Sequence, residues 1–121
     1  MSALRVVIAD DAEILRSLLR RAIDRDERLD VVAEAANGKE ALEYVSSLRP
    51  DVLLLDLSMP VLDGMEVLRQ LAGSLPVVVL TGYGESDLGT QCRELGARGF
   101  VEKGVPMQTI CDALVAAAVP A

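Results

Sequence analysis

Side chains able to carry out chemistry stand at the ends of four short apolar runs in this sequence. Asp10 and Asp11 follow the first run, and Asp56, Thr81 and Lys103 stand at the ends of three others. Three carboxylates, a hydroxyl and an ammonium are the groups that cation-assisted phosphoryl transfer to an aspartate requires. Carboxylates that share a pocket repel one another, and a hard cation such as Mg²⁺, which prefers oxygen ligands, removes that repulsion. The set predicts a magnesium-dependent phosphorylation site, provided that the fold gathers these side chains.

Each of these residues, taken singly, has a plainer explanation. Asp11 or Thr81 could cap the following helix. Asp56 could simply end a strand, and Lys103 could extend its ammonium into water. Only the combination is specific, and it depends on the elements that place the residues.

Short apolar runs of strand length alternate with segments of helical periodicity. The predicted strands are Leu4–Ala9, Val31–Ala35, Val52–Leu55, Pro76–Leu80 and Gly99–Glu102. Apolar residues that recur three or four positions apart predict helices with stripes over Ile14–Ile23, Ala41–Leu48, Met65–Leu71 and Ile110–Ala117. A further helix is predicted over Glu85–Leu95, and it is expected to be the least stable because Gly89 interrupts it.

Turn residues separate these elements, with a turn predicted at Asn37-Gly38 and a loop at Met59-Pro60 and Gly64. The alternation predicts an α/β fold with a doubly wound, five-stranded parallel sheet, because right-handed crossovers place helices on both faces. Ligands of such sheets bind beyond the carboxyl ends of the strands, where the polar residues stand. A length of 121 residues, 51% of them hydrophobic, predicts a single domain over residues 1–121.

Composition excludes several classes of function. The formal net charge of −7 disfavours direct binding to nucleic acid or to an anionic membrane. The chain contains no histidine, which excludes histidine-based catalytic triads and histidine-ligated zinc. Cys92 and Cys111 form no CxxC pair and are expected to be buried and inert. With no apolar run long enough for a membrane helix and no signal-peptide pattern, a cytoplasmic location is expected.

Four groups of residues occur in a fixed order along the chain. They are Ala9-Asp10-Asp11, Asp56-Leu57-Ser58-Met59-Pro60 with Asp63-Gly64, Leu80-Thr81-Gly82, and Phe100-Val101-Glu102-Lys103. In this order they resemble the receiver domains of bacterial two-component response regulators, over essentially the whole chain. The stretch Asp30–Leu42 also resembles receivers that precede a LuxR-type DNA-binding domain. The resemblance implies a flavodoxin-like (βα)5 fold.

The resemblance also implies a role for each site residue. Asp56 would accept a phosphoryl group from phosphohistidine on a sensor histidine kinase, or from a small acyl phosphate. Asp10, Asp11, Asp56 and the backbone carbonyl of Ser58 would hold Mg²⁺, and Lys103 would pair with a phosphoryl oxygen. The chain would thus catalyse its own phosphorylation and dephosphorylation without being an enzyme for a separate substrate.

Signal output follows from the same resemblance. The Thr81 hydroxyl would move to the phosphoryl group, and Phe100 would rotate into the space that it leaves. The changed face, formed by the fourth helix, fifth strand and fifth helix, would bind an effector domain or protein, or a second copy of the chain. Ser58 and Tyr83 would flank the path of the hydrolytic water, and the bulk of Tyr83 would slow dephosphorylation. Gly104 stands where receivers often carry proline, which leaves the geometry of this loop open.

Three alternatives belong to other classes. A degenerate receiver that binds partners without phosphorylation is the closest, but such forms usually lose part of the Asp10, Asp11, Asp56, Thr81 and Lys103 set. A phosphatase with an aspartate nucleophile would need a second acid two positions later, where this chain has Ser58. A flavin-binding electron carrier would need a hydroxyl-rich phosphate loop and stacking aromatics, which are scarce here.

Overall fold

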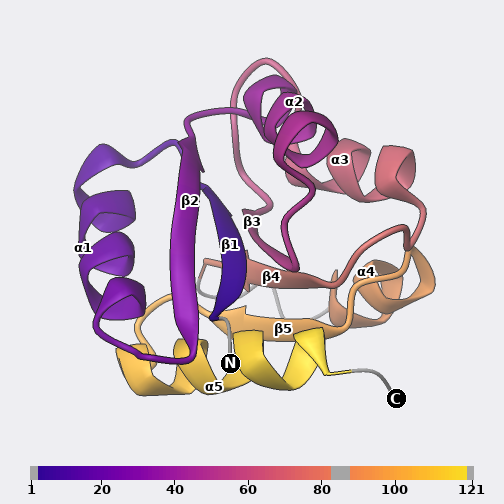
Figure 1. Cartoon of the computed structure of the whole chain (residues 1–121). Coiled ribbons are helices and arrows are strands. Elements are labelled where there is room, and N and C mark those ends of the chain that lie inside the picture. The colour runs from indigo at the N-terminus through magenta and orange to yellow at the C-terminus, as the bar shows by residue number, and fades with distance from the viewer. Residues whose placement is uncertain (1–2, 83–87, 120–121) are drawn as a thin grey trace.

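The computed structural model describes residues 3–82 and 88–119. The strands of this described part form a single parallel sheet (Figure 1). Its strands are β1 (Leu4–Ala9), β2 (Leu29–Ala35), β3 (Val52–Asp56), β4 (Val77–Thr81) and β5 (Gly99–Glu102). They pair in the order β2-β1-β3-β4-β5. The predicted five-stranded parallel sheet is therefore confirmed.

Helices cover both faces of the sheet (Figure 1). They are α1 (Glu13–Asp24), α2 (Gly38–Leu48), α3 (Gly64–Leu71), α4 (Gly89–Glu94) and α5 (Met107–Ala118). Side chains of α1 and α5 pack against one face of the sheet, and those of α2, α3 and α4 pack against the other. This is the doubly wound α/β arrangement that the alternating pattern predicts.

The central strands owe their uninterrupted apolar sequence to burial on both faces. In β3, Val52 and Leu54 face the layer of α1 and α5, whereas Leu53 and Leu55 face the layer of α2, α3 and α4. All four side chains are fully buried. The strand therefore cannot shift by one residue without exchanging its two apolar faces, so the position of its last residue, Asp56, is firmly set.

Most element bounds lie within two residues of the predicted ones. β2 begins at Leu29 rather than at Val31, and β4 runs one residue later than predicted. The predicted turn at Asn37 is instead the N-cap of α2, where the Asn37 side chain accepts a hydrogen bond from the backbone N–H of Glu40 at 2.9 Å.

The sequence predicted that Gly89 interrupts a helix. In the structure, Gly89 is instead the first residue of α4. The predicted helix start at Glu85 lies outside the described residues.

The pairing of β1 with β2 contains one irregularity. Val6 pairs with Val31, but the next residue, Val7, pairs with Ala33, so Val32 has no partner in β1. Such an insertion of one residue is a β-bulge. It lies in the strand at the edge of the sheet.

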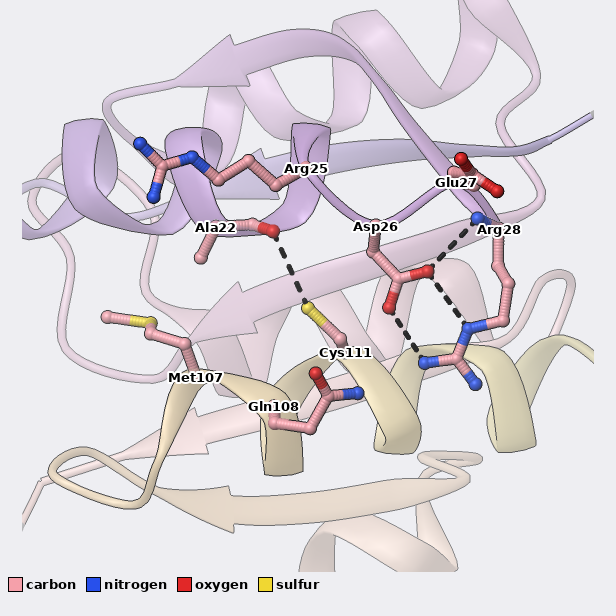
Figure 2. A pocket seen from close by; sticks show the side chains of 8 residues that line it. All are labelled: Ala22, Arg25, Asp26, Glu27, Arg28, Met107, Gln108 and Cys111. Atoms are coloured by element: carbon pink, nitrogen blue, oxygen red, sulfur yellow. Dashed lines mark hydrogen bonds and ion pairs between the residues drawn. The ribbon is translucent and has the colours of Figure 1, made fainter.

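The contact between α1 and α5 includes a shallow pocket at the end of α1 (Figure 2). The Cys111 thiol points at the backbone carbonyl of Ala22, with 3.9 Å between sulfur and oxygen. Burial raises the pKa of the Cys111 thiol, which makes it a weaker nucleophile. Cys92 is buried as well, so the predicted burial of both thiols is confirmed.

Candidate functional site

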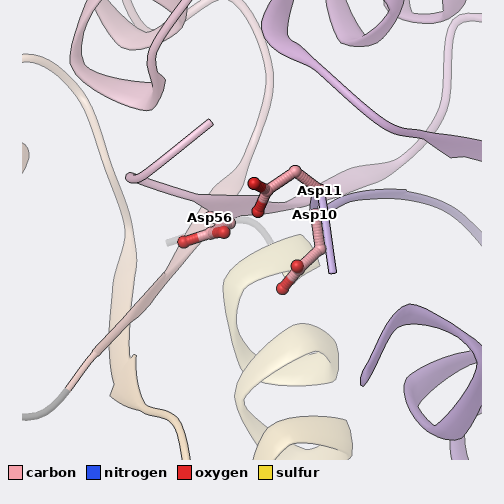
Figure 3. A group of neighbouring side chains, drawn as sticks. All are labelled: Asp10, Asp11 and Asp56. Atoms are coloured by element: carbon pink, nitrogen blue, oxygen red, sulfur yellow. The ribbon is translucent and has the colours of Figure 1, made fainter. Parts of the chain in front are cut away.

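Three carboxylates meet at the carboxyl edge of the sheet (Figure 3). Asp10 directly follows β1, and Asp56 is the last residue of the adjacent β3. The two strands pair at Ala9 and Leu55, which brings the next residue of each strand to neighbouring positions. With Asp11 from the following loop, one carboxylate oxygen of each residue lies within 4.8 Å of the others. This spacing lets one cation contact all three side chains.

Two of these carboxylates are buried and incompletely hydrogen-bonded. Asp10 is 0% and Asp56 1% exposed, whereas Asp11 is exposed. Within residues 3–82 and 88–119, Oδ2 of Asp10 and Oδ2 of Asp56 find no hydrogen-bond partner. Both oxygens face the ammonium of Lys103, at 3.7 Å and 3.2 Å respectively. One ammonium does not balance three carboxylates, so an oxygen-seeking divalent cation fits the residues present.

Burial raises the pKa of the Asp56 carboxyl above its ordinary value, and the negative charge of Asp10 raises it further. The Lys103 ammonium and the backbone N–H of Ser58 act in the opposite direction. In the pocket as it stands, the ionised form of Asp56 is thus disfavoured. A cation bound between the carboxylates would favour the ionised form.

Asp10 is held by its backbone as well as by its side chain. Its N–H donates to the carbonyl of Ala35 at 3.0 Å, and its Oδ1 accepts from the N–H of Ala12 at 2.8 Å. Its own carbonyl accepts from Nη1 of Arg16 at 2.7 Å. Arg16 also contacts Glu34 of β2, a strand from which the sequence predicted no contribution to the site.

The sequence patterns did not identify Arg16 and Glu34 as residues near the site, because both fit ordinary helix and strand patterns. A signal was present: α1 carries Arg16 and Arg20 one turn apart, opposite the only acidic residue within the predicted second strand. In the structure both arginines pair with Glu34.

The capping alternatives for two site residues are wrong. The N-cap of α1 is Ala12, so Asp11 does not occupy that position, and the N-cap of α4 is Leu88 rather than Thr81. Lys103 does not extend freely into water either, because its ammonium pairs with Asp56. These side chains are therefore available to the pocket.

Thr81 ends β4 and is 0% exposed. Its hydroxyl points at the carbonyl of Val101 across a long 3.5 Å separation, a weak contact that is easily exchanged. The backbone carbonyl of Thr81 accepts from the N–H of Lys103 at 2.7 Å, which fixes the start of the lysine loop against β4. Tyr83, predicted to slow dephosphorylation, lies outside the described residues.

Phe100 lies half-buried on β5 and packs against the layer of α2, α3 and α4. A methyl group added to Gly89 would lie 3.9 Å from the nearest ring atoms of Phe100. The ring therefore rests beside the first residue of α4. On its other side, Phe100 and Val101 line a shallow, mainly apolar groove between β5 and α5.

The loop from β3 to α3 is fastened to the pocket at several points. The N–H of Ser58, an exposed residue, donates to Oδ1 of Asp56 at 3.2 Å. Gly64 donates its N–H to the carbonyl of Leu57 at 3.0 Å, and a Cβ at Gly64 would lie 2.5 Å from the carbonyl oxygen of Asp56. Only glycine permits this approach. The role of the Ser58 carbonyl as a metal ligand stays a prediction.

The same loop contains a strained turn at Val61. The N–H of Leu62 donates to the carbonyl of Pro60 at 2.7 Å, and Val61 between them has a φ of 68°. These features define a γ-turn of the rare positive-φ kind. Val61 is 77% exposed, so packing of its side chain does not explain the choice of a β-branched residue there.

The lysine loop contains no proline directly after Lys103, and its backbone depends on glycine instead. The Lys103-Gly104 peptide bond is trans, and Gly104 has a φ of 101°. Nothing lies within 4 Å of a Cβ built at Gly104. Glycine is therefore required at this position for its conformation rather than for space.

Comparison with known proteins agrees with the geometry of the pocket. Residues 6–115 match the response regulator receiver domain family. The transcriptional regulatory protein LnrK of Bacillus subtilis is 37% identical over 115 residues, which cover 93% of this chain and 52% of LnrK. The chain therefore spans about half the length of that relative.

Two solved structures share the fold closely. The signal receiver domain of the response regulator NarL from Mycobacterium tuberculosis has a TM-score of 0.87 and 34% identity, and 98% of each chain is covered. A LuxR-family two-component response regulator from Aurantimonas has a TM-score of 0.88 and 32% identity, covering 97% of this chain and 86% of the other. The chain belongs to the response regulator receiver domain family.

Proposed function

We propose that this receiver accepts a phosphoryl group on Asp56 in a Mg²⁺-dependent reaction. An oxygen of the Asp56 carboxylate forms a bond to phosphorus, while the bond from phosphorus to the donor breaks. The donor is a phosphohistidine of a sensor histidine kinase or a small acyl phosphate, and its histidine nitrogen or acyl oxygen keeps the electron pair. The product is an aspartyl phosphate.

The observation that carries this proposal is the environment of Asp56. Its carboxylate is 1% exposed and lies between two other aspartates and the Lys103 ammonium, which is 3.2 Å away. A carboxylate that served only the fold would not need two further acids beside it, because their repulsion costs stability. A degenerate receiver would have no use for the intact set.

The residues of the pocket have distinct proposed tasks. Asp10, Asp11, Asp56 and the carbonyl of Ser58 hold Mg²⁺, which, when bound, offsets negative charge on the phosphoryl oxygens. Lys103 pairs with a phosphoryl oxygen from the side of β5. In this proposal the chain contributes mainly electrostatics and positioning. No separate substrate is turned over: the receiver catalyses its own phosphorylation and dephosphorylation.

Phosphorylation would reach a partner through Thr81 and Phe100. The Thr81 hydroxyl, held only by a 3.5 Å contact with Val101, exchanges that contact for a phosphoryl oxygen. Phe100 then turns into the space beside β4, which changes the groove that it lines with Val101 and α5. An effector domain or protein, or a second copy of the chain, binds the altered α4, β5 and α5 face.

Residues 1–121 are proposed to form one receiver domain that does not itself contact nucleic acid, since its net charge is −7. LnrK is named as a transcriptional regulatory protein and is about twice as long as the matched region. A DNA-binding output for this receiver would reside in another domain or another chain. Across the described residues, no helix combines the length and the apolar character needed to cross a membrane.

Intact mass spectrometry tests the proposal. The protein is incubated with acetyl phosphate and MgCl₂, in parallel with EDTA and with the Asp56→Asn variant. We expect the mass of one phosphoryl group to be added only to the native protein with Mg²⁺. An equal gain in Asp56→Asn would place the modification elsewhere, and no adduct with acetyl phosphate or with a panel of autophosphorylated kinases would favour the degenerate receiver.

A further inference from the structure

We propose that Arg16 is a positioning residue for the acidic pocket. It fixes the peptide group between Asp10 and Asp11, and thereby the mutual arrangement of the two carboxylates that a divalent cation requires. This inference rests on the proposed function, because it presupposes that the pocket binds Mg²⁺. It assigns a role in that site to α1 and β2, which contribute no carboxylate to the pocket.

The Arg16 guanidinium bonds in two directions. Nη1 donates to the backbone carbonyl of Asp10 at 2.7 Å, and Nε contacts Oε1 of Glu34 at 3.3 Å. The Arg16 side chain is only 17% exposed and that of Glu34 23% exposed. A planar group held at two points by partly buried partners has little freedom to rotate. Arg16 therefore links the loop after β1 rigidly to the body of β2.

The contact with the Asp10 carbonyl matters because this carbonyl is part of the peptide group that joins Asp10 to Asp11. The N–H of Asp10 is fixed by Ala35 and its side chain by Ala12. The peptide plane that leads on to Asp11 is held through its oxygen by Arg16. If this plane rotated, Asp11 would swing relative to Asp10, because Asp11 is exposed and lies in a loop. Arg16 thus controls the spacing of the carboxylates.

Arg20 provides a matched comparison within the same network. Its Nη1 also pairs with Glu34, and its Nε lies 3.5 Å from Asp24. Arg20 is 48% exposed and has the same charge as Arg16, but among the described residues it contacts Glu34 and Asp24 rather than the Asp10 carbonyl. Replacing either arginine removes one positive charge and one contact with Glu34. Only replacing Arg16 releases the peptide group between Asp10 and Asp11.

Electrostatics alone predicts the opposite result to positioning. A positive charge near the pocket repels a cation, so removing the charge of Arg16 should strengthen Mg²⁺ binding if charge were its only influence. If Arg16 positions the pocket, removing it should weaken binding. The sign of the change in affinity therefore decides between the two roles.

The test is an amide NMR titration with MgCl₂ of the unphosphorylated native protein and of Arg16→Met, Arg16→Lys and Arg20→Met. We expect Arg16→Met to weaken Mg²⁺ binding about tenfold, as loss of an outer-shell contact to a metal site typically does. Arg20→Met should stay within about twofold of the native affinity, since its contacts are exposed. Arg16→Lys, which keeps the charge but cannot bond in both directions, should fall between them.

The same spectra report whether each variant is folded, and urea unfolding without Mg²⁺ separates affinity from stability. Unchanged or tighter Mg²⁺ binding by Arg16→Met overturns the role of Arg16 while leaving the proposed function intact. If Arg16→Met does not fold, native affinity in Arg16→Lys overturns it. Absence of Mg²⁺ binding by the native protein would overturn both this inference and the magnesium dependence of the proposed function.

Discussion

The ammonium of Lys103 lies 3.2 Å from Oδ2 of Asp56, although β5, which Lys103 follows, and β3, which ends at Asp56, are not neighbours. β4 lies between them, and Lys103 is tied to it by the bond from its N–H to the Thr81 carbonyl. The lysine side chain thus crosses the end of β4 to reach the pocket. Its ammonium is a fixed counter-charge to the buried carboxylates.

Replacing Lys103 should slow phosphorylation of Asp56. In Lys103→Met, the phosphoryl oxygens lose a pre-placed cation, and the rate with acetyl phosphate and Mg²⁺ should fall about 10²-fold. Lys39→Met is the matched control, because Lys39 is an exposed lysine on α2. The rates are measured by intact mass against time. A native rate in Lys103→Met would exclude a role for this ammonium in the transfer step.

Gly64→Ala should destabilise the domain by about 1–3 kcal/mol, since the new methyl group would overlap the backbone at the end of β3. Its Cβ would lie 2.5 Å from the Asp56 carbonyl oxygen. Gly89→Ala is the control, because its Cβ would meet Phe100 at an ordinary 3.9 Å. Urea unfolding should show a loss for Gly64→Ala and no loss for Gly89→Ala. Equal stabilities would mean that the α3 loop can move away from Asp56 at little cost.

Sequence patterns predicted the positions of the pocket residues because parallel strands deliver their last residues to one edge. The apolar runs identified the strand that precedes Asp10 and the strands that end at Asp56 and Thr81, and burial on both faces explains why those runs were easy to identify. The bounds of β2 were less clear, because exposed Asp30 interrupts the apolar pattern at the sheet edge. That the pocket residues carry out the proposed chemistry stays a prediction.

Val61→Gly should raise the free energy of unfolding by up to about 1 kcal/mol. A residue with a side chain at the observed φ of 68° destabilises the folded state by about 1–2 kcal/mol, and glycine removes this cost. The greater conformational freedom of glycine in the unfolded chain offsets part of the stability gained. Since the Val61 side chain is 77% exposed, little burial is lost. Chemical denaturation gives the comparison, with Val61→Ala as the control that keeps the strain. A destabilised glycine variant would show that the turn is not strained.

Acid should remove a small stabilising contribution from Asp26. Hydrogen bonds from the Arg28 side chain and N–H lower the pKa of Asp26 from 3.8 to about 2 (Figure 2). Because the folded-state pKa is depressed, this contribution is present above pH 3.8 and is lost as the pH falls towards 2. Arg28 is 46% exposed, so the contribution at neutral pH should not exceed about 1 kcal/mol.

Urea unfolding of the native protein and Asp26→Asn between pH 7 and pH 2 measures this contribution. At pH 7 the native protein should have a higher free energy of unfolding than Asp26→Asn. This difference should shrink as the pH falls towards the folded-state pKa of Asp26. Asparagine keeps the oxygen that accepts from the Arg28 N–H, which isolates the effect of the charge. A difference that did not change with pH would assign the effect to packing instead.

The contact of α1 with the loop after β1 was beyond the reach of sequence patterns. Periodicity indicates which face of α1 is apolar, but it does not show that Arg16 reaches the Asp10 carbonyl, because that contact depends on how α1 lies against the loop after β1. The γ-turn at Val61 was also unpredictable, since valine is a poor residue for positive φ. Both features are set by tertiary structure against local preference.

The unpaired residue Val32 divides β2 into two phases of side-chain alternation. Before it, Leu29 and Val31 face the layer of α1 and α5, whereas after it Ala33 and Ala35 face the opposite layer. An unbroken strand that kept Val31 in place would turn Glu34 away from α1, out of reach of Arg16. The extra residue of an edge strand therefore decides which face of the sheet Glu34 occupies, and with it whether Arg16 finds a carboxylate partner on β2.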